Sequence, residues 1–355
     1  MEMNDRFLRA CRREPVDVTP VWFMRQAGRY MAEYRLIREK YSLIEICRHP
    51  EIAAEVTLQP VRALGVDAAI LFADILLPVI PLGLGLEFAK GEGPVIASPV
   101  HTLEDVRRMK PFNAEADLGY VMEAIRLLRG TLGGVPLIGF CGAPFTVASY
   151  VIEGGSSREF LKTKTMMYSA PEVFHALMDK LSTVLTDYIV AQIHAGAQAI
   201  QLFDSWVGTL SPHDYENFVL PYSQRILEAV KKENVPAIHF GTNTTTLLPL
   251  MKLAGGDVIG LDWRIPLDQG WSLLGNDVAV QGNLDPAILF APLPEIKQRV
   301  TDVLRRADGR PGHIFNLGHG ILQHTPVENV RAVVDIVHEY SVLPKGEGLG
   351  VRGSA

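Results

Sequence analysis

Residues 20–30 read PVWFMRQAGRY, an apolar run opened by a proline and followed by two arginines four positions apart. The apolar half suits a short buried strand. Arg25 and Arg29 stand where this strand ends, and each guanidinium can hold a carboxylate or phosphate through two parallel hydrogen bonds. Gly28 lets backbone amides approach the same anion. The stretch predicts an anion site at a strand end, the alternative being ion pairs between these arginines and acids of the next helix.

Seven further apolar runs follow, and each ends in polar or glycine residues. They cover residues 67–72, 135–140, 197–203, 235–240, 257–261, 278–280 and 313–315. Helical patterns separate them, for example over residues 50–65 and 171–194. Eight strands alternating with helices predict an α/β fold, a single-domain (β/α)8 TIM barrel, with its chemistry on the loops after the strands. The alternative is an open doubly wound sheet, which gathers ligand contacts into one or two crevices.

Local patterns add detail to this prediction. Residues 87–97 favour a small hairpin. Thr102 and Asp105 have the spacing of a capping box at a helix start. At the start of the last helix, we expect Thr325 to be the N-cap and Pro326 the first helical residue.

Composition indicates a globular protein of a reducing compartment. The formal net charge of −6 argues against a nucleic-acid binder, which needs a basic surface. Cys11, Cys47 and Cys141 are widely separated and form no disulfide pattern. The N-terminal residues lack an apolar signal segment, and the most apolar stretch is broken by charge, prolines and glycines. We expect a cytoplasmic protein without a membrane partner, with a barrel over residues 1–344 and a flexible Gly-rich tail over residues 345–355.

Other strand ends also carry residues that suit chemistry. Asp74, Ser205 and His319 follow the second, fourth and eighth runs, and Tyr150 lies on the helix after the third. Three of them have a structural alternative, because Asp74 or Ser205 can cap a helix and Tyr150 can be a core tyrosine with a satisfied hydroxyl. His319 stands between two glycines, which packing does not explain, so a functional role is favoured there.

The strand ends show no motif for a bound cofactor. The sequence has no phosphate loop, no GxGxxG after the first strand and no Cys-rich ligand set. We therefore expect chemistry that needs no nucleotide, other organic cofactor or metal.

These segments together resemble the uroporphyrinogen decarboxylase family. The matching segments are residues 20–30 (PVWFMRQAGRY), 67–76 (DAAILFADIL), 135–150, 198–205, 260–263, 281–286 (QGNLDP) and 316–320 (NLGHG). They occur in order over almost the whole chain. One departure is DSWV at residues 204–207, where some members have Glu-Ser-His-Ala, so a histidine role beside Ser205 is not available here.

The resemblance implies a single (β/α)8 domain, a homodimer and a cofactor-free reaction of heme biosynthesis. In that reaction the four acetate side chains of uroporphyrinogen III lose carbon dioxide to give coproporphyrinogen III. The resemblance also implies substrate contacts for the residues at the family's motif positions, which are Arg25, Gln26, Ala27, Gly28, Arg29, Asp74, Tyr150, Ser205 and His319. Arg38 matches a further family arginine, with less certainty about contact.

Asp74, Arg25 and His319 are the catalytic candidates. A protonated pyrrole ring can accept the electrons released with carbon dioxide, and Asp74 would offset the positive charge that develops. Arg25 and Arg29 would orient carboxylates. Arg25 is a poor proton donor because guanidinium pKa values lie above about 12, whereas His319 titrates nearer neutrality. The proton donor stays open.

Two other functions compete with this interpretation. A zinc-dependent methyltransferase on a related barrel carries His-x-Cys at the end of the fifth strand, but this chain has His239-Phe240-Gly241 and lacks the thiolate. A tetrapyrrole carrier that binds without reacting needs anion clamps alone. A carboxylate aimed at the pyrrole nitrogens, as expected of Asp74, favours catalysis.

Overall fold

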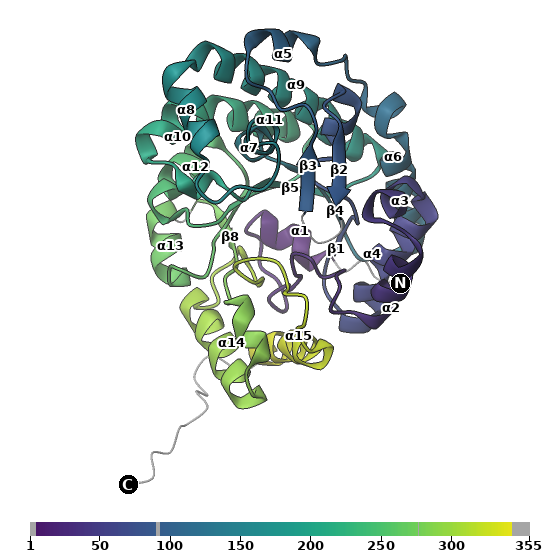
Figure 1. Ribbon diagram of the computed structural model, residues 1–355. Coiled ribbons are helices and arrows are strands. Elements are labelled where there is room, and N and C mark those ends of the chain that lie inside the picture. The colour runs from purple at the N-terminus through teal and green to yellow at the C-terminus, as the bar shows by residue number, and fades with distance from the viewer. Residues whose placement is uncertain (1–4, 90–92, 276, 343–355) are drawn as a thin grey trace.

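The computed structural model describes residues 5–89, 93–275 and 277–342. Parallel strands form one curled sheet in the order β1-β4-β5-β6-β7-β8-β9, and helices surround it (Figure 1). The strands are β1 (Ala69–Ile70), β4 (Leu137–Gly142), β5 (Ala199–Asp204), β6 (Ala237–Gly241), β7 (Val258–Gly260), β8 (Ala279–Gln281) and β9 (His313–Ile314). Each coincides with one of the seven later apolar runs, and the predicted α/β barrel is confirmed.

The first predicted strand closes this sheet into a barrel. Val21 pairs in parallel with Phe315, which directly follows β9. The Phe315 amide donates to the Pro20 carbonyl at 2.8 Å, and the Trp22 amide donates to the Phe315 carbonyl at 3.3 Å. On the other side, the Asp67 amide donates to the Val21 carbonyl at 2.8 Å and so joins the segment to the start of β1. The pairing is a short bridge because Pro20 has no N–H with which to extend the ladder.

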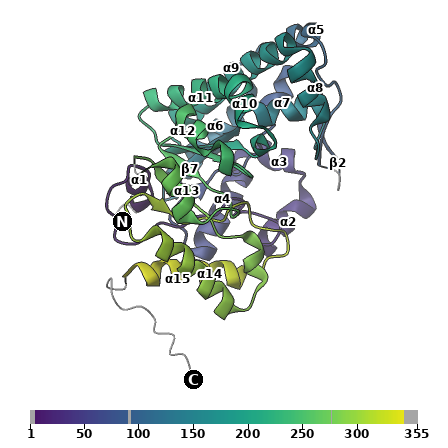
Figure 2. The ribbon, with the colours of Figure 1, turned by 90° about the vertical axis from the view of Figure 1, so that its left-hand side faces the viewer.

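Helices pack on the outside of the strands. They are α1 (Arg6–Cys11), α2 (Ala32–Lys40), α3 (Leu43–Arg48), α4 (Pro50–Leu64), α5 (Leu103–Arg108), α6 (Ala114–Thr131), α7 (Pro144–Glu153), α8 (Leu161–Ser169), α9 (Pro171–Ala195), α10 (Pro212–Phe218), α11 (Leu220–Lys232), α12 (Leu248–Ala254), α13 (Leu267–Leu274), α14 (Leu293–Ala307) and α15 (Val327–Val342). Short 3-10 helices are η1 (Leu77–Leu82), η2 (Val207–Thr209), η3 (Thr245–Leu247) and η4 (Pro286–Phe290). Figures 1 and 2 both place α14 and α15 on the side of the molecule opposite α5 and α8. In the described part of the chain, no helix has the length and apolar character needed to cross a bilayer.

The barrel interior is packed with side chains and is crossed by one polar chain. The rings of Phe140 and Phe203 meet edge to face at 5.5 Å. Trp22 Nε1 donates to Gln281 Oε1 at 2.9 Å, and Gln281 Nε2 donates to Gln201 Oε1 at 3.1 Å. Trp22, Gln281 and Gln201 are buried. They lie on the first strand, on β8 and on β5 respectively, so their bonds span the interior. A filled core of this kind leaves chemistry to the loops at the strand ends.

The predicted hairpin over residues 87–97 is confirmed. Strand β2 (Leu86–Ala89) pairs antiparallel with β3 (Gly93–Ile96), while residues 90–92 of the turn lie outside the described residues. Val95 forms a further bridge with Gly155, just after α7. The hairpin therefore lies against the end of the helix that carries Tyr150.

The capping box at α5 is also confirmed. The Asp105 amide donates to Thr102 Oγ1 at 3.2 Å, and the Thr102 amide donates to Asp105 Oδ2 at 2.8 Å. Two of the unpaired N–H groups at this helix end are thus satisfied by one pair of side chains.

The expected N-terminus of the last helix is wrong by one residue. Helix α15 begins at Val327, and the Pro326 carbonyl accepts from the Val330 amide at 3.3 Å, so Pro326 precedes the first helical residue. Thr325 is 3% exposed, and its hydroxyl has no hydrogen-bond partner among the described residues. The burial of Thr325 turns its hydroxyl away from a capping role. The predicted flexible tail, residues 345–355, lies outside the described residues.

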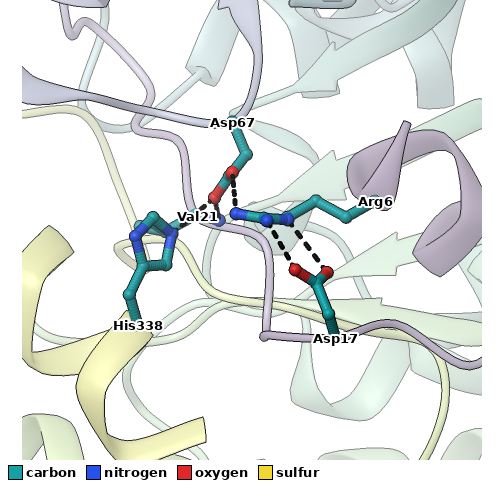
Figure 3. A network of polar contacts seen from close by, with 5 residues as sticks. All are labelled: Arg6, Asp17, Val21, Asp67 and His338. Carbon is teal, nitrogen blue, oxygen red and sulfur yellow. Dashed lines mark hydrogen bonds and ion pairs between the residues drawn. The ribbon is translucent and has the colours of Figure 1, made fainter. Parts of the chain in front are cut away.

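A network of charged groups centred on Asp67 holds together segments from both ends of the chain (Figure 3). Asp67 is buried, and its Oδ2 accepts from the Val21 amide at 2.8 Å. Arg6 of α1 donates to Asp67 Oδ1 at 3.0 Å and forms a second ion pair with Asp17. His338 of α15 contacts Asp67 Oδ2 at 2.8 Å. One carboxylate thus connects the first strand, the start of β1, the first helix and the last helix.

Candidate active site

The predicted strand-end residues converge around Arg25. The loop after the first strand carries Arg25, the loops after β1 and β9 carry Asp74 and His319, and α7 carries Tyr150. The charge of Arg25 acts on the pKa of each of the other three side chains. The structure therefore brings these four residues together at the carboxyl ends of the strands.

Arg25 has an unusual backbone conformation and a specific contact. Its φ of +59° is left-handed, which costs a residue with a side chain roughly 1–2 kcal/mol. Such conformations persist where the surroundings impose them, and they cluster at functional sites. The side chain passes over Gly320, where a β-carbon would lie 2.7 Å from Arg25 Cγ. The glycine after His319 thus provides the space that the exposed arginine occupies.

Asp74 is a half-buried carboxylate with one oxygen engaged. Its Oδ1 accepts from the Leu76 amide at 2.8 Å, which forms a turn ahead of η1. Burial raises the pKa of Asp74, while the Leu76 amide and the charge of Arg25 oppose this rise. Within the described residues, Oδ2 has no hydrogen-bond partner, and Asp74 does not stand at the N-cap of a helix. The carboxylate therefore keeps an oxygen available for a ligand.

Tyr150 packs against an aromatic ring and feels the charge of Asp74. Its ring centroid is 3.9 Å from that of Trp206, with the planes inclined by 31°. Burial raises the pKa of Tyr150, as does the charge of Asp74, while the Ser156 hydroxyl and Arg25 oppose these effects. The phenol is therefore protonated near neutral pH and can donate a hydrogen bond.

His319 is held in its neutral form. Burial lowers the pKa of His319 to about 4, and the positive charges of Arg25 and Arg264 contribute to this shift. Its ring meets the Trp263 ring edge to face, with centroids 6.5 Å apart. A neutral imidazole in the free protein can donate one hydrogen bond and accept another.

Ser205 follows β5 and is half-buried. Its carbonyl accepts from Thr242 Oγ1 at 2.6 Å. The next 3-10 helix, η2, is preceded by Trp206 and has no side-chain cap. Capping therefore does not explain Ser205, and its contact with substrate stays a prediction.

The residues between the two arginines fix the loop and expose its backbone. Gln26 is fully buried; its Oε1 accepts from the Phe23 amide at 3.1 Å and its Nε2 donates to the Ala68 carbonyl at 3.1 Å. The loop is thereby fixed to the residue that precedes β1. Ala27 and Gly28 are half-buried, so they can offer backbone groups to a ligand.

Arg29 and Arg38 lie apart from this cluster. Arg29 is exposed and lines a cavity of about 440 Å³ with Arg35 and His324. Arg38 donates to the Tyr41 carbonyl at 2.7 Å, a contact that fixes the end of α2. The cavity beside Arg29 includes none of the four clustered residues, and Arg38 has a local bond, so substrate contact by either arginine stays a prediction.

Sequence analysis did not single out two neighbours of these residues, Trp206 and Arg264. Trp206 directly follows Ser205 and packs on Tyr150. Arg264 follows β7 by a few residues and affects the pKa of His319. Each lies three residues beyond an apolar run, whereas Asp74 lies two beyond its run, so the strand-end rule that selected Asp74 would have found them had it been extended by one position.

His239, the residue at issue in the zinc alternative, points away from the barrel interior. Gln201 points inward, so the next residue, Leu202, and its register partner His239 face the helix layer. His239 is fully buried there, with Nε2 3.8 Å from Asp204 Oδ2. Among the described residues, no group of three or more His, Cys, Asp or Glu side chains is arranged to hold a metal ion.

Comparisons with known proteins agree with this fold and identify a family. A family model described as uroporphyrinogen decarboxylase matches residues 2–340. A relative from Carboxydothermus hydrogenoformans is 59% identical over 342 residues, which is 96% of this chain and 98% of the relative. A relative from Sorangium cellulosum is 60% identical over 337 residues, which is 95% of this chain and 96% of the relative. Both relatives bear the name uroporphyrinogen decarboxylase.

Among solved structures, a methyltransferase from Methanosarcina mazei has a TM-score of 0.78 to this chain. The alignment covers 96% of this chain and 99% of the methyltransferase at 22% sequence identity. At that identity the likeness shows a shared barrel fold and nothing about chemistry.

Proposed function

The chain belongs to the uroporphyrinogen decarboxylase family, and we propose that it removes carbon dioxide from the four acetate side chains of uroporphyrinogen III. The product is coproporphyrinogen III, an intermediate of porphyrin and heme biosynthesis, in which each acetate has become a methyl group. The protein is thus a carboxy-lyase. The observation that carries the mechanism is the half-buried Asp74 beside Arg25, with one carboxylate oxygen free.

The substrate supplies its own electron sink. A proton adds to the ring carbon next to the one that bears the acetate, and the ring becomes a delocalised cation that can accept electrons from the acetate side chain. The bond to the carboxylate then breaks, carbon dioxide leaves, and the electron pair neutralises the ring. A second proton adds to the exocyclic carbon, and loss of the first proton restores the pyrrole with a methyl group.

Asp74 stabilises the cationic states of this sequence. Its free oxygen accepts the pyrrole N–H bonds, and its negative charge opposes the charge of the ring. Because the carboxylate is half-buried, the attraction is stronger than it would be in water. Burial also raises the pKa of Asp74, because the negative charge is only partly compensated in the free protein. The substrate cation supplies the missing compensation.

The remaining residues bind and orient the substrate. Arg25 holds the reacting acetate, and Arg29 holds a carboxylate at the rim. The neutral His319 and the protonated Tyr150 supply hydrogen bonds. Ser205 and the backbone of Ala27 and Gly28 complete the contacts.

The test is a carbon dioxide assay with uroporphyrinogen III kept reduced under anaerobic conditions. We expect complete conversion to coproporphyrinogen III and carbon dioxide from every acetate. Binding without release of carbon dioxide would instead support a tetrapyrrole carrier. Activity should also survive dialysis against a chelator; loss of activity with recovery in zinc would support metal chemistry of the methyltransferase kind.

We also propose that the enzyme is a homodimer of the cytoplasm and has neither nucleic acid nor membrane as a partner. The family resemblance supports the dimer, and the net charge of −6 opposes attraction to polyanions. Light scattering at micromolar protein should give twice the chain mass of 39.1 kDa. A mass that stays at that of one chain would contradict the dimer.

A further inference from the structure

The loop after β7 carries an arginine that is held in place yet open to ligands. Arg264 Nη1 donates to Asp262 Oδ2 at 2.6 Å, and its guanidinium carbon lies 4.1 Å from the centre of the Trp263 ring. Asp262 is 2% exposed and also accepts from the Arg264 amide at 3.0 Å, whereas the Arg264 side chain is 45% exposed. An ion pair and a stacked ring thus fix the orientation of an accessible guanidinium.

The position of Arg264 in the barrel places it next to the site. Strand β9, which leads to His319, lies between β7 and the first strand, which leads to Arg25. The Trp263 ring contacts both the Arg264 guanidinium and the imidazole of His319. The charges of Arg25 and Arg264 both lower the pKa of His319. This agrees with the order of the strands, in which the strand before His319 lies between those that lead to the two arginines.

A cavity of about 440 Å³ adjoins Arg264 on the side of α13. Its polar wall is formed by Thr245, Gln269 and Ser272 together with Arg264. An arginine has five N–H donors, and the bond to Asp262 uses one of its side-chain donors. In the described residues, the others have no protein partner, so the cavity offers several donors and room for the end of a short carboxylated arm.

The substrate has more carboxylates than the other candidate residues can bind. Uroporphyrinogen carries an acetate and a propionate on each of its four rings, and the reaction leaves the propionates in place. Arg25 and Arg29 lie in one loop, on one side of His319 in the order of the strands. Carboxylates that extend toward β7 lie away from this loop, and a guanidinium on the β7 side can bind one of them.

We propose that Arg264, with Thr245, Gln269 and Ser272, binds a peripheral carboxylate of the substrate that is not reacting. The assignment rests on the proposed function, and it adds a binding position on the β7 side of the site. Because Asp262 balances part of its charge, Arg264 contributes directed hydrogen bonds more than long-range attraction.

The test compares Arg264→Gln and Arg264→Lys with a control, Arg299→Gln on α14, where Arg299 pairs with Glu295 on an exposed helix face. Arg264→Gln should raise KM for uroporphyrinogen roughly 10-fold and leave kcat within about twofold, because the lost contact serves the bound substrate and the transition state equally. Arg264→Lys should fall between Gln and the wild type. The control should match the wild type. An unchanged KM in Arg264→Gln would overturn the proposal.

Product binding then identifies the carboxylate. Coproporphyrinogen keeps only the propionates, so weaker inhibition of Arg264→Gln by this product assigns a propionate, and unchanged inhibition with a raised uroporphyrinogen KM assigns an acetate. Anaerobic binding titrations with uroporphyrinogen test Arg264 without turnover. A wild type that binds but releases no carbon dioxide refutes the proposed function, whereas equal affinities of wild type and Arg264→Gln refute this inference.

Discussion

Asp74 accepts a structural hydrogen bond and carries a negative charge, and Asp74→Asn keeps the first while removing the second. Asparagine keeps an oxygen for the Leu76 amide but cannot oppose a cation. We expect kcat for carbon dioxide release to fall on the order of 10² to 10³, the usual scale for one preorganised electrostatic group. The melting temperature should stay equal or rise, because burial that raises the pKa of Asp74 also makes its charge unfavourable in the folded state.

Asp74→Glu is the complementary variant. It keeps the charge but moves the carboxylate by about 1 Å, and displacements of that size are enough to lose activity. Near-normal carbon dioxide release by a folded Asp74→Asn protein would show that Asp74 serves only the turn before η1.

The two loop arginines should not tolerate lysine. Arg25→Lys and Arg29→Lys keep the charge but replace a planar fork of donors with a point charge. We expect kcat/KM to fall roughly 10-fold or more in each variant, with the larger effect at Arg25, which lies among the other site residues. Arg62→Lys is the matched control, because Arg62 pairs with Glu55 on the exposed face of α4. Three variants with the same steady-state kinetics as the wild type would make Arg25 and Arg29 ordinary surface cations.

His319 should make stability depend on pH in one direction. Its folded pKa of about 4 lies below its ordinary value of 6.5, so between these values the unfolded chain binds a proton that the folded protein does not. The stability from this histidine is complete above pH 6.5 and is lost as pH falls toward 4. His319→Asn should flatten the slope of unfolding free energy in that range, by at most about 1.4 kcal/mol per pH unit. Urea unfolding at several pH values measures this slope, and equal slopes in the two proteins would contradict a neutral His319.

At the level of the secondary elements, the loop after β9 is shaped around Arg25. Gly320→Ala adds a methyl group that would lie 2.7 Å from Arg25 Cγ, so the arginine must move. We expect kcat/KM to fall by roughly 10- to 100-fold, because displacing an orienting group by about 1 Å has effects of that size.

Gly119→Ala in α6 is the control for Gly320→Ala, since no atom lies within 4 Å of a β-carbon there. This variant should keep full activity and gain about 1 kcal/mol of stability from higher helix propensity. Full activity of Gly320→Ala would mean that Arg25 does not need the position seen in the structure.

The helices and strands show which sequence signals are sufficient to predict secondary structure. The strands and most helices were predicted because apolar periodicity and caps such as Thr102 with Asp105 are local properties. Helix α3 was missed, although Ser42 and Glu45 form a second capping box by the same rule. Its six residues are too few to show a periodic pattern.

The site shows the same division between local and tertiary information. Arg25, Asp74 and His319 were predicted because each follows a strand, and Tyr150 because it lies on the helix after one, all within family motifs. A slightly wider strand-end rule would have named Arg264, but not its fixed orientation, which depends on Trp263 and on the burial of Asp262. Periodicity in the sequence contains no information on such contacts.

For the whole molecule, the charged network of Figure 3 joins the two ends of the chain. Asp67→Asn removes the charge that faces Arg6 and His338 while keeping an acceptor for the Val21 amide. We expect a loss of about 3 kcal/mol in unfolding free energy, the low end of the range for breaking a buried ion pair, because Arg6 keeps its second partner Asp17.

Asp17→Asn is the control within the same network. Asp17 pairs with Arg6 but is 63% exposed, so its loss should cost less than about 1 kcal/mol. Denaturant unfolding of both variants measures the difference. Equal losses in the two variants would show that the burial of Asp67 does not matter for barrel closure.

The pairing of Val21 with Phe315 also orders events during synthesis. The segment that leads to Arg25 leaves the ribosome early, whereas its partner next to β9 emerges near the end of translation. Until then the first strand has a neighbour on one side only, and the loop of His319 and Gly320 that adjoins Arg25 does not exist. Contacts between such distant residues form late and slowly. A partly made chain therefore holds most of the barrel but no complete site, and substrate binding begins only once the last strand has joined the first.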